Sequence, residues 1–175
     1  MPKGDLLKKA LSALPERLGA VFVDWDNLVI PTEMDQDLDI SEINIHLMQA
    51  LLNASLRFID KAHLFVFTSE GNINRNYFLE VDAEEFDLEL IVVPSTKDAA
   101  DEAIRLKAEE LMDKEDISTF IFGSGDGYFI DIARKLKQAG KKVIFMPYSK
   151  DNFHNQYRNM LDPGNIVFLK PYIIS

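Results

Sequence analysis

The sequence predicts a three-layer α/β/α domain, Rossmann-like in architecture, with a mainly parallel sheet of five to six strands at its centre. Short apolar runs without polar alternation recur along the chain, and such runs are typical of strands buried on both faces of a parallel sheet. Segments with helical spacing of apolar residues lie between them, which is the alternation expected of α/β folds. The 175 residues contain no repeat, linker or low-complexity tract, so we expect one domain over 1–175, with its core at about 19–147 and a C-terminal extension at 148–175.

The first part of the chain combines an amphipathic segment with a strongly apolar strand. The spacing of leucine and alanine predicts a short helix at about 5–14, and the apolar run that ends at Asp24 predicts the first strand at about 20–24. The acidic stretch 28–40 contains Pro31 and is expected to form a long solvated loop. A helix is expected at about 42–58, with Ser41 as its N-cap.

The remaining elements alternate regularly between strands and helices. Apolar runs predict the second to fifth strands at 63–68, 88–93, 117–122 and 143–146, and a sixth, edge strand at 166–169. Periodicity predicts helices near 73–85, at 98–114 and at 128–139. If the first strand is central and the crossovers are right-handed, the strand order is 3-2-1-4-5. The chain then reverses direction between strands one and four, where a ligand crevice opens.

Composition narrows the chemistry that the chain can perform. There is no cysteine and there are only three histidines without metal-ligand spacing, so any bound metal must be a hard ion such as Mg²⁺ or Mn²⁺ held by carboxylates. No apolar run reaches the length of a membrane span and no signal peptide opens the chain; we therefore expect a cytoplasmic protein with no membrane partner. The formal net charge of −10 opposes non-specific binding to nucleic acid.

Three aspartates from distant parts of the sequence are expected to meet in the crevice. Asp24 ends the first strand, and Asp126 follows the fourth strand at the same edge of the sheet. Asp101 falls between Ala108 and Met112 in helical projection, on the core-facing side of the helix that leads into strand four. Such close carboxylates cannot all ionise without compensation, and a divalent cation would supply it.

The segments that carry these acids resemble the NYN domain family of PIN-like nucleases. The resemblance lies in Phe22–Asn27, Lys97–Asp101 and Gly123–Phe129, and it continues through Ala139–Val143. It covers about 20–147, with three motifs in the family's order. It implies the same strand order and a Mg²⁺- or Mn²⁺-dependent endoribonuclease that hydrolyses RNA phosphodiester bonds.

Carried over by motif, the resemblance implies that Asp24, Asp101 and Asp126 bind the metal and perform catalysis, with Asn27 beside them. Asn27 and Ser124 are also expected to orient the acids and contact substrate. This chain has Tyr128 and Lys107 where the family usually carries further acids. Asp26 is then a candidate replacement ligand, whereas a site with too few acids would bind without cleaving.

Two alternatives stay open at the level of sequence. The Phe22–Asp26 segment also resembles the first motif of haloacid dehalogenase-like phosphatases, with Asp24 as nucleophile, Asp26 as general acid and Asp131 in the metal motif. The second alternative is a catalytically degenerate adaptor that binds RNA or protein, which Tyr128 and Lys107 favour.

Contacts with single-stranded RNA are expected from two segments outside the acid cluster. Arg75 follows a strand end on the same edge as the acids and is a candidate phosphate contact. Residues 148–158 mix aromatic and basic side chains, which can stack on bases and hold phosphates. The same segment could instead pack against its own domain or against a second subunit in a homodimer.

Overall fold

The central element of the computed structural model is a five-stranded, all-parallel sheet. The structure describes residues 4–6, 16–72 and 86–173. The strands are β1 (Leu18–Asp24), β2 (Lys61–Ser69), β3 (Phe86–Val93), β4 (Thr119–Gly123) and β5 (Lys142–Phe145). Their order, β3-β2-β1-β4-β5, confirms the predicted topology.

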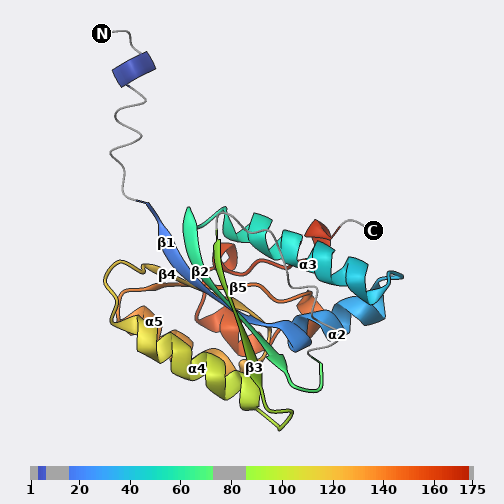
Figure 1. Ribbon diagram of the computed structural model, residues 1–175. Coiled ribbons are helices and arrows are strands. Elements are labelled where there is room, and N and C mark those ends of the chain that lie inside the picture. Colours follow the sequence, from blue (N-terminus) through green and yellow to red (C-terminus); the bar gives the residue numbers. More distant parts are fainter. Residues whose placement is uncertain (1–3, 7–15, 73–85, 174–175) are drawn as a thin grey trace.

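The helices cover the two faces of this sheet, as the apolar pattern predicts (Figure 1). Helices α2 (Trp25–Asp35) and α3 (Ile40–Ser55) bury their apolar residues with Val21 and Val23 of β1 on one face. Helices α4 (Ala99–Met112) and α5 (Ile130–Gln138) do the same with Ala20 and Phe22 on the other face. The three-layer architecture follows because β1 alternates its side chains between two apolar layers.

The prediction of a long solvated loop at 28–40 is wrong, because most of this segment belongs to α2. Pro31 lies inside this helix and contributes no backbone donor. Burial of Leu28, Val29 and Thr32 holds the helix nevertheless, and the Thr32 hydroxyl donates to the Leu28 carbonyl at 2.7 Å. Tertiary burial thus outweighs the local signal of the proline.

Two further predictions differ from the structure, one for a helix cap and one for a strand. The N-cap of α3 is Asp39 rather than Ser41, because the Asp39 carboxylate accepts from the Glu42 backbone N–H at 3.0 Å and from the Ser41 hydroxyl at 2.6 Å. The sixth strand is also wrong, because Ile166 forms only an isolated parallel bridge with Phe145.

Short 3₁₀ helices make up most of the ordered turns after β4. They are η2 (Gly127–Phe129), η3 (Lys150–Asn152), η4 (Asn155–Asn159), η5 (Pro163–Asn165) and η6 (Lys170–Tyr172). The helix expected near 73–85 and most of the one expected at 5–14 lie outside the described residues. In the part of the chain that is described, no helix is long and apolar enough to cross a membrane.

Candidate metal centre

A cavity of about 620 Å³ opens at the carboxyl ends of β1, β2 and β3, beside the first turn of α4. The described residues that line it include five aspartates: Asp24, Asp26, Asp98, Asp101 and Asp126. Lys97 is the one basic side chain among these lining residues. The three acids predicted to converge therefore do face a common space, at the edge where ligands of parallel α/β sheets bind.

Asp24 is the last residue of β1 and the N-cap of α2. Its carboxyl group accepts a hydrogen bond from the Asn27 backbone N–H at 3.4 Å, and the residue is only 7% exposed. Burial raises the pKa of Asp24 to about 8, and the neighbouring Asp101 contributes to the rise. A carboxyl group held this far from water is costly to ionise, unless a cation offsets the charge.

Asp101 lies in the first turn of α4, is also 7% exposed, and lines the same cavity as Asp24. Burial raises the pKa of Asp101 to about 6, with further contributions from Asp126 and Asp98. Asp98 begins the helix with a left-handed φ of 62°, a conformation that aspartate tolerates better than most residues. The backbone turn at Asp98 therefore leads directly into the first turn of α4, which carries Asp101.

Asp126 is exposed and lies in the loop between β4 and η2. Its carboxylate caps η2 by accepting from the Tyr128 backbone N–H at 2.9 Å. Its backbone carbonyl accepts a hydrogen bond from the Tyr157 hydroxyl, and the neighbouring Gly125 carbonyl accepts from the His154 N–H at 3.0 Å. The C-terminal extension therefore holds the Asp126 loop, a role that no local signal in the sequence indicated.

Ser124 and Asn27 connect the loops that carry the acids. The Ser124 hydroxyl donates to the Asn27 side-chain oxygen at 3.3 Å and accepts from the Asp126 backbone N–H at 3.2 Å. Asn27 lines the cavity, whereas Ser124 is 2% exposed and does not. Ser124 is thus placed to fix the Asp126 loop against α2 and is too deeply buried to contact substrate.

Asp26 lines the cavity but already has partners on β2. Its carboxylate accepts from the Thr68 hydroxyl at 2.8 Å and from the Ser69 backbone N–H at 3.0 Å. These bonds tie the first turn of α2 to the end of β2. The only indication of these hydrogen bonds in the sequence is the pair of polar residues that ends β2, Thr68 and Ser69.

The other residues singled out from the sequence lie elsewhere. Lys107 lies with its ammonium group 5.2 Å from the centre of the Phe65 ring and does not line the cavity. Asp131, which the phosphatase interpretation needs at the metal, is 89% exposed and pairs with Arg134 at 3.6 Å. Arg75 lies outside the described residues.

The aromatic residues of 148–158 pack against their own domain. Tyr148, Phe153 and Tyr157 are buried, and the Tyr157 ring lies 4.1 Å from the ring of Phe145 in β5. Of the roles expected for this segment, packing against the domain is the one that the structure shows. These rings are too buried to stack on RNA bases.

The donors in the cavity suit a hard divalent cation. Within the described ranges, no group of three or more histidine, aspartate or glutamate side chains stands ready to hold a metal ion. Asp24 and Asp101, which both line the cavity, still provide the ligands that Mg²⁺ commonly uses, one or two carboxylates completed by water and a substrate phosphate. Their raised pKa values are the expected signature of two acids that lack a nearby positive charge.

Comparison with known proteins gives one match, to a family model. The model described as NYN domain matches residues 19–162, which is well over half of the chain. Searches of curated proteins and of solved structures gave no match. The match includes the strand that carries Asp24, the helix that carries Asp101, the loop after β4 that carries Asp126, and the part of the C-terminal extension that holds this loop. The chain therefore belongs to the NYN domain family, a family of PIN-like nucleases.

Proposed function

We propose that this chain is a divalent-metal-dependent endoribonuclease whose acids are Asp24, Asp101 and Asp126. The observation that carries the proposal is that Asp24 and Asp101, both buried, line one cavity at the carboxyl end of β1. Two buried carboxyl groups without a compensating positive charge destabilise the folded protein. Their burial together in a fold of the nuclease type therefore favours a role in binding a cation.

The residues that line the cavity would have different roles in the reaction. Asp24 and Asp101 would hold Mg²⁺ or Mn²⁺, which when bound supplies a Lewis acid for water activation and for the charge on the scissile phosphate. The exposed carboxylate of Asp126 faces the same cavity and would complete the site from the opposite loop. Asn27 would orient Asp24 and Asp126 through its backbone N–H and through Ser124.

The proposal is tested by RNA cleavage and Mn²⁺ binding measured on the same preparations. We expect the wild-type chain to cleave RNA with Mn²⁺ or Mg²⁺ and to lose cleavage in EDTA. Asp24→Asn, Asp101→Asn and Asp126→Asn should each lower cleavage by at least about 100-fold, because each removes a charge that the cation or the transition state needs.

Asp131→Asn is the matched control, because it removes an exposed acid that does not line the cavity. This variant should cleave RNA like the wild type. Cleavage that persists in EDTA, or that survives all three asparagine substitutions, would contradict the proposal.

A non-catalytic RNA-binding adaptor is the second candidate. It is favoured by one observation, that the described residues contain no ready group of three metal-binding side chains. Such a protein would retain RNA without cleaving it and would bind Mn²⁺ weakly. The same assay therefore separates the two functions.

A further inference from the structure

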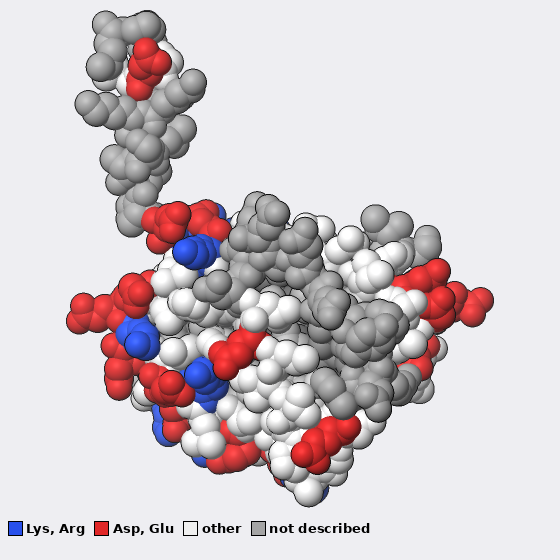
Figure 2. All heavy atoms as spheres, viewed as in Figure 1, with Lys and Arg blue, Asp and Glu red and all other residues white. Residues whose placement is uncertain are grey.

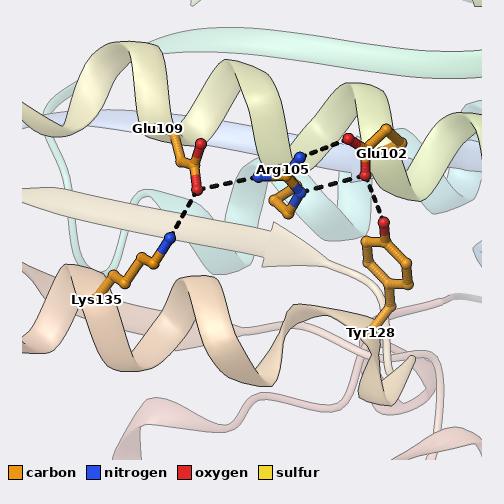
Figure 3. A network of polar contacts seen from close by, with 5 residues as sticks. All are labelled: Glu102, Arg105, Glu109, Tyr128 and Lys135. Atoms are coloured by element: carbon orange, nitrogen blue, oxygen red, sulfur yellow. Dashed lines mark hydrogen bonds and ion pairs between the residues drawn. The ribbon is translucent and has the colours of Figure 1, made fainter.

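A hydrogen bond joins the two segments that carry Asp101 and Asp126. The Tyr128 hydroxyl, in η2, donates to the Glu102 carboxylate of α4 at 2.5 Å (Figure 3). Glu102 directly follows Asp101 in the chain, and Tyr128 lies two residues after Asp126.

The acceptor of this bond is fixed in place by its own helix. Arg105 donates to both oxygens of Glu102, at 2.5 and 3.2 Å, and also pairs with Glu109 at 3.0 Å. The ion pair with Arg105 holds the Glu102 carboxylate in place for the Tyr128 hydroxyl. Tyr128 therefore meets a preformed, charged acceptor, the kind of hydrogen bond that is stronger than a neutral one.

The donor side is fixed as firmly. The Tyr128 backbone N–H holds the Asp126 carboxylate at 2.9 Å, so one residue grips Asp126 through its backbone and α4 through its side chain. The ring of the next residue, Phe129, is fully buried and lies 5.6 Å from the ring of Phe122 in β4. An acid at position 128 would instead face Glu102 and repel it.

We propose that Tyr128 is a positioning residue that sets the spacing of Asp101 and Asp126, and thereby the affinity of the centre for a divalent cation. The inference rests on the proposed function, because it assigns to this contact the geometry of the same site.

The test is Mn²⁺ binding to the full chain, followed by electron paramagnetic resonance of the free ion, with Tyr128→Phe against wild type. Loss of an outer-shell hydrogen bond commonly weakens metal binding by about 10-fold or more, and we expect about a 10-fold rise in the Mn²⁺ dissociation constant. In a Glu102→Ala background the tyrosine substitution should have no further effect, because its partner is already gone.

Two controls separate positioning from general destabilisation. Tyr148→Phe removes another tyrosine–carboxylate hydrogen bond, of 2.6 Å to Asp35, away from the cavity. Lys135→Ala removes the 3.0 Å contact between α5 and Glu109 of α4, which Figure 3 shows beside the contact of Tyr128. Both variants are expected to lower thermal stability slightly and to leave the Mn²⁺ dissociation constant within twofold of wild type.

The outcomes distinguish the two proposals. If wild type binds Mn²⁺ and Tyr128→Phe binds it equally well, the positioning role is wrong and the proposed function stands. If the Tyr148→Phe control weakens binding as much as Tyr128→Phe, the effect is general and the positioning role is again wrong. If wild type binds no Mn²⁺, the proposed function itself fails.

Discussion

Asp24 has two roles, and asparagine at this position could fill only one of them. Its carboxyl group caps α2 through the Asn27 N–H, a task that asparagine performs equally well. Its second task is to face Asp101 inside the cavity, which favours a charge only when a cation is present. If Asp24 served only as a cap, the folded protein would be more stable with asparagine at this buried position. The carboxyl group of Asp24 therefore indicates a functional role.

The stability of the metal-free protein should therefore fall as the pH rises. Asp24 and Asp101 have pKa values of about 8 and about 6 in the folded chain and near 3.8 when unfolded. Between about pH 4 and pH 8 the folded state binds more protons than the unfolded state, so its stability is lost across this window. We expect the melting temperature in EDTA to decrease from pH 5 to pH 8.

Asp24→Asn should flatten this decrease, and Mn²⁺ should reverse it, because the cation favours the ionised acids. Melting curves in EDTA and in Mn²⁺ at several pH values measure both effects. An equally steep decrease in Asp24→Asn would show that other groups cause it.

Residue periodicity and position predicted Asp24, Asp101 and Asp126 as cavity residues, because each depends on one element and on its place at the sheet edge. The partners of Asp26 could not be predicted, because they depend on the register that sets Asp24 opposite Phe67 in β2. The burial of Ser124 likewise depends on loops that meet only in the folded chain.

At the scale of elements, the packing of the C-terminal extension on the Asp126 loop is the least local feature of the site. Gly125 is required there, because a Cβ at this position would lie 1.7 Å from the Asn152 carbonyl oxygen. Gly125→Ala must push the loop and the extension apart. Overpacking of this kind typically costs about 1–3 kcal/mol, and we expect a melting temperature lower by roughly 2–10 °C with weaker Mn²⁺ binding.

Gly164→Ala is the matched control, since a Cβ at this position meets nothing within 4 Å. It should change stability by less than about 0.5 kcal/mol. A Gly125→Ala protein with wild-type melting and Mn²⁺ binding would show that the extension does not support the loop.

The strands and the helices α3, α4 and α5 were predictable because their apolar patterns are strong. Helix α2 was not, because Pro31 and the acids after it argue locally for a loop, while burial of Trp25 and Leu28 decides for a helix. The final apolar run forms one isolated bridge, between Ile166 and Phe145, and its Val167 and Leu169 N–H groups donate to Phe145 and Pro147. The apolar pattern could not distinguish this arrangement from a full strand.

At the scale of the molecule, the charge opposes the proposed substrate. The chain carries a net charge of −10, and acidic side chains are spread over the face seen in Figure 2, with basic ones among them. Under the proposed function, the cation and Lys97, which lines the cavity, would attract an RNA phosphate locally.

We expect binding of a short phosphorothioate RNA, followed by fluorescence anisotropy, to require Mn²⁺ and to depend weakly on salt. For roughly two phosphate contacts, log K should fall with log salt at a slope of about −1.4. Lys97→Ala should weaken RNA binding and leave Mn²⁺ binding unchanged, whereas Lys61→Ala, at the opposite end of β2, should change neither. Tight binding in EDTA with a steep salt slope would show that a basic surface holds the RNA instead.

The most direct test of the central claim is a crystal structure of the chain grown with Mn²⁺, with anomalous data collected at the manganese edge. We expect an anomalous peak in the cavity within about 2.0–2.3 Å of carboxylate oxygens of both Asp24 and Asp101, a distance range typical of small hard divalent ions. A peak elsewhere, or no peak at saturating Mn²⁺, would contradict the metal-binding role of these two acids.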